Sequence, residues 1–303
     1  MMKITEFYGE IQRFNPDLVI SANEPMSKHT SFKIGGPAAL MAFPKNTEEL
    51  AVLLKMSKLM DINVAILGAG TNVLAPDAGM NQLVICLKDC MGGMEKIDET
   101  HIRVAGGVTM TRAAVFAATQ GLSGLEFAHG IPGTVGGGVY MNAGAYGGEI
   151  CQVCTQVDVM DRAGNTRSLS ADQMGFSYRH SILEDTGDIV VSCVFALTPA
   201  PESQIRERMQ ELMKKRSASQ PLDLPSAGSA FKRPVGGYAA AMIDQAGLRG
   251  FQIGGAAVSE KHAGFVVNLG GATAHDVKQV LEKVSNTVFD QTGIRLTPEV
   301  RIW

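Results

Sequence analysis

An arginine in an aromatic and hydroxyl-rich stretch is the first residue that could support chemistry on a carboxylate. Arg179 lies in Phe176-Ser177-Tyr178-Arg179-His180-Ser181. An arginine stays protonated at neutral pH and can hold a carboxylate with two parallel hydrogen bonds. An isolated arginine usually makes a surface ion pair, but these neighbours favour a fixed cation.

A serine and a glutamate in the C-terminal third could serve the same site. Ser229 stands in Gly228-Ser229-Ala230-Phe231-Lys232-Arg233-Pro234, ahead of two cations. It could contact a phosphate or lie in a plain turn, and the motif alone favours the turn. The Gly-x-Ser-x-Gly elbow of hydrolases is absent. Glu299 lies in Leu296-Thr297-Pro298-Glu299-Val300-Arg301, where a residue so near the C-terminus is normally structural.

The first glycine-rich loop follows a short apolar run. Val64-Ala65-Ile66-Leu67 leads into Gly68-Ala69-Gly70-Thr71-Asn72, which is similar to the start of a dinucleotide-binding fingerprint. A Rossmann site requires a third glycine and an immediate helix, and Pro76 argues against that helix. The loop could still cup a phosphate with its N–H groups, or it could be a simple turn.

A second, denser loop runs from Gly130 to Gly148. Its glycines cost conformational entropy on folding, which a chain tolerates where the backbone must approach a ligand closely. Gly133 and Thr134 can offer N–H and hydroxyl groups to a pyrophosphate, and the glycines at 136–138 would leave room for a flat ring. Two such loops in one chain indicate a large ligand with two phosphates.

Hydrophobic spacing and capping residues predict the elements that position these loops. The predicted helices are 48–60 with Thr47 as N-cap, 109–120, 204–216, and 274–292 between Thr273 and Gly293, with Asp276 as the capping-box partner of Thr273. The predicted strands are 39–43, 64–67, 83–87, 102–105, 156–161 and 189–197. This order indicates an α+β fold, in which a two-part β-rich region precedes a smaller α/β lobe.

Composition narrows the class of protein. The chain has 303 residues and a net charge of −3, which gives no general drive toward nucleic acid or anionic membranes. No segment approaches the ~20 apolar residues of a spanning helix. Five cysteines and no secretory signal suggest reduced thiols in a cytoplasm. We interpret Cys151-Gln152-Val153-Cys154 as two small core-side residues rather than a redox or metal motif.

Three motifs together carry a specific resemblance. Gly68-Ala69-Gly70-Thr71-Asn72, Ile131-Pro132-Gly133-Thr134-Val135-Gly136-Gly137 and Asn142-Ala143-Gly144-Ala145-Tyr146-Gly147 resemble the FAD-binding domain of the vanillyl-alcohol-oxidase-like flavoproteins. Within that superfamily the chain resembles the UDP-N-acetylenolpyruvoylglucosamine reductases, from Thr30 to Arg301. The resemblance implies a two-part FAD-binding region plus a C-terminal α/β substrate lobe. We expect segments 1–87 (with the tail 300–303), 88–200 and 201–299.

The resemblance also implies an activity. Members of this family reduce UDP-N-acetylglucosamine enolpyruvate to UDP-N-acetylmuramate in peptidoglycan precursor synthesis, with non-covalent FAD and with NADPH as co-substrate. Arg179 would meet the charge on the enolised carboxylate, Ser229 would protonate the adjacent carbon, and Glu299 would be the third catalytic group. We therefore expect a cytoplasmic enzyme whose partners are these small molecules, without nucleic acid, membrane or obligatory protein partner.

The family motifs extend to binding residues. The implied cofactor contacts are Gly68, Ala69, Gly70, Thr71, Asn72, Gly130, Ile131, Pro132, Gly133, Thr134, Gly136, Gly137, Asn142, Ala143 and Gly144. The implied substrate contacts are Tyr178, Lys232, Arg233, Arg249 and His262. Two alternatives are another FAD-dependent oxidoreductase of this fold, acting on an alcohol or hydroxy acid, and a non-catalytic binding module. The presence of all three catalytic residue types disfavours both.

Overall fold

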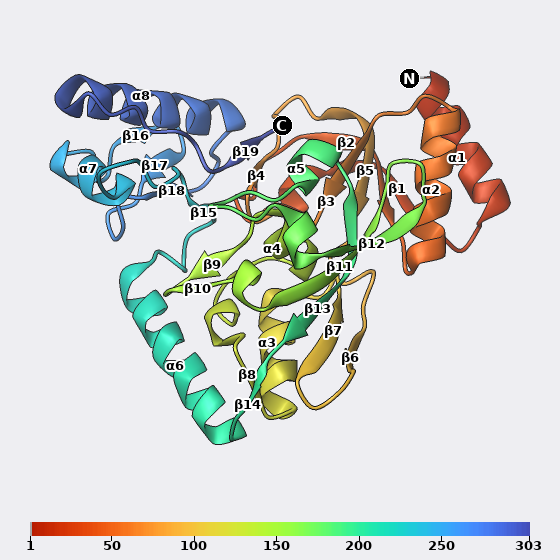
Figure 1. Ribbon diagram of the computed structural model, residues 1–303. Helices are drawn as coiled ribbons and strands as arrows, with labels where there is room; N and C mark the ends of the chain where they lie inside the picture. Colours follow the sequence, from red (N-terminus) through yellow and green to blue (C-terminus); the bar gives the residue numbers. More distant parts are fainter. Residues whose placement is uncertain (1) are drawn as a thin grey trace. The chain divides into compact units, whose positions relative to one another are not determined.

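The computed structural model describes residues 2–303 (Figure 1). The chain forms two compact units that are interleaved in sequence. The first unit comprises the chain up to Ala22, Leu40–Ala69 and Asn81–Lys215, and the second comprises Asn23–Ala39, Gly70–Met80 and Arg216–Trp303. No helix of the described chain has the length and apolar character needed to cross a membrane.

The predicted segments are 1–87 with the tail 300–303, 88–200 and 201–299, whereas the structure groups residues 23–39 and 70–80 with the C-terminal part. Strand pairing is one reason for this grouping. β19 (Arg301–Ile302) runs parallel to β4 (Val73–Leu74). The C-terminal tail, residues 300–303, therefore pairs with a segment that lies within 1–87. The division of the FAD-binding region into two subdomains stays a prediction.

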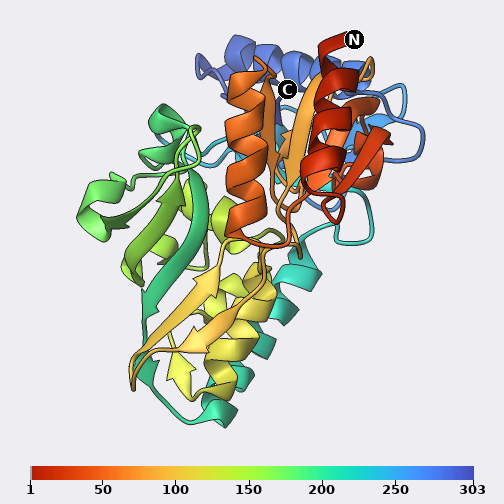
Figure 2. The ribbon, with the colours of Figure 1, turned by 90° about the vertical axis from the view of Figure 1, so that its right-hand side faces the viewer.

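The first unit begins with a four-stranded sheet that has two helices beside it. The strand order is β1 (Val19–Pro25), β2 (Pro37–Phe43), β5 (Met80–Cys86) and β3 (Val64–Leu67). Figure 2 shows α1 (Met2–Phe14) and α2 (Thr47–Leu59) side by side. Asn46, not the predicted Thr47, caps α2, because its side chain accepts a hydrogen bond from the Glu49 N–H. The sequence prediction missed α1, which buries only a short apolar stripe including Phe7 and Ile11.

A five-stranded sheet forms the rest of the first unit's framework. The strand order is β12 (Thr166–Ser170), β11 (Cys154–Met160), β13 (Ile189–Ala196), β7 (His101–Ala105) and β6 (Met94–Lys96). α3 (Met110–Thr119) and the short α4 (Val135–Tyr140) share a buried core with this sheet. Thr109 caps α3 by accepting a hydrogen bond from the Arg112 N–H.

Smaller elements complete the first unit. They are β8 (Leu122–Ser123) paired with β14 (Thr198–Pro199), β9 (Gly144–Ala145) paired with β10 (Gly148–Glu149), α5 (Leu183–Thr186), and the 3-10 turns η2 (Glu126–Ala128), η3 (Ile150–Gln152) and η4 (Ala171–Met174). α6 (Glu202–Ser219) follows and runs past Lys215, where the first unit ends.

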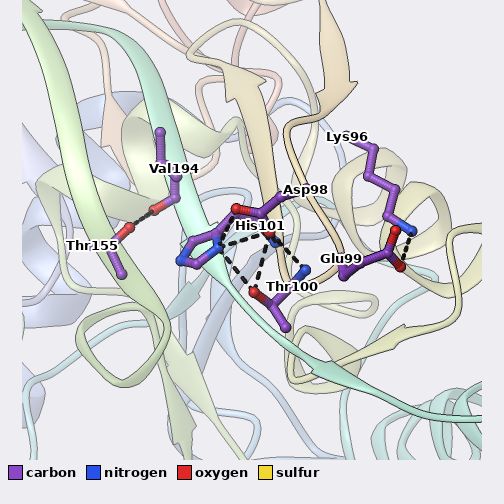
Figure 3. A network of polar contacts seen from close by, with 7 residues as sticks. All are labelled: Lys96, Asp98, Glu99, Thr100, His101, Thr155 and Val194. Atoms are coloured by element: carbon purple, nitrogen blue, oxygen red, sulfur yellow. Dashed lines mark hydrogen bonds and ion pairs between the residues drawn. The ribbon is translucent and has the colours of Figure 1, made fainter.

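The loop between β6 and β7 is held by one carboxylate (Figure 3). Asp98 Oδ1 accepts hydrogen bonds from the Thr100 and His101 N–H groups, both at 2.8 Å. The backbone N–H of Thr100, followed by the side chain of His101, lowers the Asp98 pKa to about 2. These hydrogen bonds stabilise the turn between β6 and β7. The position of His101 is therefore explained by contacts within the protein.

The second unit is a sheet backed by helices. The antiparallel strand order is β15 (Ser226–Ser229), β18 (Phe265–Asn268), β17 (Ala256–Val258) and β16 (Gln252–Ile253), and the helices are α7 (Ala239–Gln245) and α8 (Ala274–Thr292). The turn η1 (Met26–Lys28) also belongs to this unit. As predicted, Thr273 and Asp276 form a capping box on α8, and Gly293 ends the helix with φ +73°.

An aspartate from a distant segment adds a second cap to α8. Asp77 accepts hydrogen bonds from the N–H groups of Ala274 at 2.7 Å and His275 at 3.1 Å. These two donors are among the N–H groups that a helix start leaves without an intrahelical acceptor. The segment 70–80 is thereby bound to the C-terminal lobe.

A single carboxylate also joins three strands of the five-stranded sheet. Asp158 on β11 accepts hydrogen bonds from Ser168 on β12 at 2.6 Å and from Ser192 on β13 at 2.7 Å. Gln156 donates a third hydrogen bond at 2.9 Å. Burial would raise the Asp158 pKa, but these hydrogen bonds outweigh it and hold the pKa below its usual range.

We predict that Asp158→Asn destabilises the protein by about 1–2 kcal/mol at pH 7, because hydrogen bonds to a charged group are lost. The native-state pKa lies below the ordinary value of 3.8, so the ionised carboxylate stabilises the fold above that value and loses this effect as pH falls through the native pKa. The difference from the parent should therefore shrink below about pH 4. Urea unfolding from pH 3 to 7 measures it. The same substitution at exposed Asp172 is the control, and a pH-independent difference at Asp158 would contradict the prediction.

Candidate functional site

The two glycine-rich loops meet within the first unit. A side chain at Gly68 would place its Cβ 2.7 Å from Thr134 Oγ1, closer than real Cβ contacts allow. Thr134 Oγ1 is already engaged, because it accepts a hydrogen bond from the Gly137 N–H at 3.2 Å and so caps α4. A side chain at position 68 would therefore displace the Thr134 hydroxyl from its capping position.

Both loops present backbone donors at this meeting point. Among the residues that the structure describes, no protein acceptor pairs with the N–H groups of Ala69 and Gly133. Gly133 adopts φ +147°, a conformation that residues with a side chain rarely take. Backbone N–H groups held without internal acceptors are suited to an anionic ligand.

The glycines of α4 have different neighbours. A Cβ at Gly136 would lie 3.1 Å from the Gly106 oxygen, and one at Gly138 would lie 2.8 Å from Met110 Sδ. These two glycines therefore allow close packing within the protein, and room for a flat ring beside them stays a prediction. A Cβ at Gly137 would meet only Thr134 Oγ1, at 3.5 Å, which is an ordinary van der Waals contact. Of these three glycines, only Gly137 can therefore take a side chain without crowding.

A buried imidazole nitrogen lies just before the second loop. His129 Nδ1 is buried and has no hydrogen-bond partner among the described residues. Burial, followed by the charge of Arg206, lowers the His129 pKa, so the ring is neutral at physiological pH. An orphaned buried polar atom is costly unless a ligand or water satisfies it. His129 was not among the predicted site residues, and only its place before Gly130 could have indicated it.

The other predicted cofactor residues mostly shape the backbone. Ile131 donates its N–H to Ala128 O at 3.1 Å, and Ala143 donates to Gly138 O at 2.8 Å. Gly144 leaves no space for a side chain, since a Cβ there would lie 2.6 Å from Glu149 Cγ. Gly130 and Pro132 flank Ile131 in the loop.

Arg179 is held in a tight turn of the first unit. Ser177 and His180 exchange backbone hydrogen bonds at 3.1 and 3.2 Å around Tyr178 and Arg179. Arg179 has φ +56°, and its guanidinium carbon lies 5.0 Å from the centre of the Tyr178 ring. Tyr178 is exposed. Stacking on an aromatic ring limits the positions that the cation can take.

Ser229 and Glu299 are brought together in the second unit. The segment around Glu299 pairs with the segment after Ser229 in a short antiparallel ladder: the Glu299 N–H donates to Ala230 O at 2.9 Å, and the Lys232 N–H donates to Thr297 O at 2.8 Å. Ser229 is exposed, and Glu299 is half-buried. Two of the three predicted catalytic residues therefore lie on neighbouring backbone positions, although 69 residues of chain separate them.

The first glycine-rich loop continues into this ladder. Asn72 Nδ2 donates to Glu299 O at 3.1 Å, and the Arg301 N–H donates to Asn72 O at 3.0 Å. Gly70, with φ +63°, lies against the backbone of His29, so that a Cβ would approach His29 O to 2.0 Å. Thr71 lies between Gly70 and Asn72 in the chain. All three residues belong to the second unit.

Two cations follow Ser229. Lys232 is half-buried, and among the described residues no carboxylate pairs with its ammonium group. The Arg233 guanidinium carbon lies 4.1 Å from the centre of the exposed Tyr238 ring. Tyr238 was not among the predicted site residues. Its place after Arg233 in the same Gly/Pro-rich loop was the sequence signal that could have indicated it. Lys232 is suited to an anion, and the Arg233–Tyr238 pair to an anion or a flat ring.

The structure gives Arg249 a partner within the protein. Its guanidinium pairs with Asp244 and donates to Glu260 O at 2.7 Å. The hydrogen bonds that Arg249 donates to the Asp244 carboxylate raise the Arg249 pKa. These contacts fix the guanidinium, so a substrate contact by Arg249 stays a prediction that must use its remaining donor capacity.

His262 is held as one tautomer. Its Nδ1 accepts a hydrogen bond from the Gly264 N–H at 3.1 Å, which leaves the proton of the neutral ring on Nε2. The ring stacks edge-on against Phe265 with centroids 5.0 Å apart. Burial, with a smaller contribution from the charge of Arg249, lowers the His262 pKa. His262 can thus act as a neutral N–H donor.

The CxxC segment does not behave as two core residues. Cys154 is buried on β11, but Cys151 is exposed. The interpretation of both as core-side residues was therefore wrong for Cys151, because η3 turns that part of the chain outward before the strand begins. Among residues 2–303, no group of three metal-ligating side chains is assembled.

Comparison with known proteins gives consistent matches. Residues 220–303 match the C-terminal domain of UDP-N-acetylenolpyruvoylglucosamine reductase, and residues 38–170 match an FAD binding domain. A UDP-N-acetylenolpyruvoylglucosamine reductase of Agathobacter rectalis is 46% identical over 298 residues, which cover 95% of each chain. One from Latilactobacillus sakei is 44% identical over 292 residues, covering 95% of this chain and 94% of that protein.

A solved structure shares the fold. The crystal structure of UDP-N-acetylenolpyruvylglucosamine reductase from Thermus caldophilus superposes with a TM-score of 0.78 and 32% identity. The match covers 94% of this chain and 98% of that one. This similarity confirms the predicted α+β fold with an FAD-binding region and a C-terminal substrate lobe.

We predict that Gly137→Leu separates cofactor binding from folding. Leucine is a better helix former than glycine by about 1 kcal/mol, and the side chain meets only Thr134 at the Cβ position. The flavin-free variant should melt at or above the parental temperature, yet bind FAD at least tenfold more weakly. Circular dichroism and flavin fluorescence titration measure the two effects. Gly136→Ala is the control and should lower the melting temperature, because its Cβ crowds Gly106. Parental FAD affinity in Gly137→Leu would place the cofactor elsewhere.

Proposed function

Since this chain belongs to the family of UDP-N-acetylenolpyruvoylglucosamine reductases, we propose that it reduces UDP-N-acetylglucosamine enolpyruvate to UDP-N-acetylmuramate, with FAD as cofactor and NADPH as co-substrate. The observation that carries the proposal is the backbone pairing that sets Glu299 opposite Ala230, the residue next to Ser229, in motifs of a family matched at 46% identity over 95% of the chain. The product serves the synthesis of peptidoglycan precursors.

The first unit fits FAD. The unpaired N–H groups of Ala69 and Gly133 can bind the pyrophosphate. His129 Nδ1, buried without a partner, can accept from or donate to a polar group of the cofactor, according to its tautomer. When bound, FAD supplies the hydride that adds to the carbon–carbon double bond of the substrate, after accepting it from NADPH.

Arg179 has the role of holding the substrate carboxylate. Negative charge develops on this carboxylate as the double bond is reduced, and a fixed guanidinium stabilises that charge more than it stabilises the ground state. The strained turn and the Tyr178 ring limit the motion of Arg179. Such a cation loses little by reorganisation when the charge appears.

Ser229 has the role of delivering the proton. A free hydroxyl is a weak acid, so its proton must be favoured by its surroundings. Lys232, half-buried and three residues further along the chain, favours the deprotonated hydroxyl electrostatically. Glu299 orients the reacting group or shares a proton. Lys232, Arg233 and the Nε2–H of His262 are suited to the diphosphate and sugar.

The cellular location follows from the substrates rather than from the fold. NADPH and nucleotide-activated sugars are used inside cells, so we propose that the enzyme acts in the cytoplasm. Retention of the activity in the membrane-free fraction of lysed cells supports this location, and activity confined to the membrane pellet contradicts it.

We predict that Ser229→Ala separates the two half-reactions. NADPH should still bleach the flavin at near-parental rate, because that step needs no proton from Ser229. Reoxidation by the enolpyruvyl sugar nucleotide should slow by a factor on the order of 10² or more, the usual scale for loss of a general acid. Stopped-flow absorbance at the flavin band measures both on one sample.

Ser226→Ala, on the same strand β15, is the control and should leave both rates unchanged. If Ser229→Ala slowed both half-reactions equally, Ser229 would be a binding or structural residue. If it slowed neither, the proton would come from another group, and Glu299 would be tested next.

A further inference from the structure

Asn142 is a buried polar residue in an uncommon backbone conformation. Only 2% of it is exposed, and its φ is +42°. Asparagine tolerates this left-handed region better than most other residues with a side chain. It follows α4 and precedes the β9–β10 hairpin, so it lies where the second glycine-rich loop turns back.

The amide of Asn142 is fully oriented by its partners. Oδ1 accepts a hydrogen bond from the Cys151 N–H at 2.9 Å, and Nδ2 donates to Ser177 O and to Glu149 Oε2, both at 3.1 Å. A backbone carbonyl can only accept and a backbone N–H can only donate, so the amide cannot be reversed. Both amide hydrogens are used within the protein, and neither is left for a cofactor.

One of these hydrogen bonds reaches the turn that carries Arg179. Ser177 is the first residue of the Ser177–His180 turn. Just beyond the other end of the turn, Ser181 donates its hydroxyl to Tyr140 O at 2.8 Å. The segment 140–142 therefore holds the turn on both sides of Tyr178 and Arg179, and all of these residues belong to the first unit.

This tie opposes a local strain. A residue with a side chain in the left-handed region costs about 1–2 kcal/mol, and Arg179 has φ +56°. Such a conformation persists only where the surroundings over-determine it. Without the bond from Asn142 to Ser177 O, the turn can relax to other backbone states that direct the guanidinium elsewhere.

We propose that Asn142 is the positioning residue of Arg179, and that its amide keeps the turn in the one state from which Arg179 meets the substrate carboxylate. The proposal rests on the function proposed above and deepens it. Asn142 touches neither cofactor nor substrate through its amide hydrogens. Its effect must therefore appear in the step that uses Arg179, and not in the reduction of the flavin.

Asn142→Asp tests this with almost no change of shape. The carboxylate still accepts from Cys151, but it faces Ser177 O and Glu149 without a hydrogen to donate. We expect FAD content and flavin reduction by NADPH to stay near parental. Reoxidation by the enolpyruvyl sugar nucleotide should slow by about tenfold or more, with a raised half-saturating concentration, as expected for misplaced substrate binding.

A double-mutant cycle with Arg179→Lys identifies the residue through which Asn142 acts. If Asn142 acts through Arg179, Asn142→Asp should cause less than a threefold further loss in the Arg179→Lys background, because the group it positions is already altered. Full additivity of the two losses would overturn the proposal. Gln152→Ala is the matched control. It removes the hydrogen bonds to the Glu149 N–H and Gly147 O from the same hairpin, touches no part of the turn, and should leave both half-reactions unchanged.

The remaining outcomes also test the positioning role of Asn142. Asn142→Gly suits the positive φ and replaces Asn142→Asp if the latter does not fold; if neither variant folds with FAD bound, the amide is a general structural residue and the proposal is wrong. Equal slowing of both half-reactions has the same meaning. A parental protein that the enolpyruvyl sugar nucleotide does not reoxidise refutes the proposed function, whereas a parental rate in Asn142→Asp refutes only the positioning role.

Discussion

The close approach of the Thr134 side chain to the backbone of Gly68 is the constraint on which the first unit's ligand site depends. No side chain fits between them, and Thr134 Oγ1 is committed to capping α4. The meeting point presents the backbone N–H groups of Ala69 and Gly133 without protein acceptors among the described residues. A site built from backbone has a fixed shape whatever the side chains around it do, which suits a cofactor that stays bound through many turnovers.

A fixed geometry is also found where residues with side chains adopt positive φ. Asn142 and Arg179 both do so, and a hydrogen bond joins the amide of the first to the turn of the second. A chain that only needed a turn would place glycine there, at lower cost. A strained but fixed conformation of Arg179 suits a guanidinium that binds a carboxylate at one set position, because electrostatic stabilisation depends on groups that are positioned in advance.

Local sequence patterns predicted most helices and strands well. Features that depend on contacts between distant segments could not be predicted from them. The helix after Thr273 and the strand Val64–Leu67 have the predicted bounds, because capping residues and apolar runs are local signals. The short α4 was missed, since its three glycines oppose a helix and only packing against Gly106 and Met110 explains it. Segments 23–39 and 70–80 belong to the second unit through contacts such as that of Asp77 with α8, which no local pattern reveals.

The site residues show the same division. Motifs identified Ser229 and Glu299, and tertiary pairing sets them on adjacent positions; no spacing rule could have predicted that the amide of Asn72 binds the Glu299 carbonyl. The loop from Gly68 to Asn72 thus begins beside Thr134 in the first unit and ends on the ladder of the second. Its first half presents the backbone N–H of Ala69 without a protein acceptor among the described residues, and its second half binds the backbone carbonyl of Glu299. Each of these residues therefore has its own structural reason: Gly68 leaves room for the Thr134 side chain, Gly70 allows the close approach to His29 O, and the Asn72 amide binds the Glu299 carbonyl.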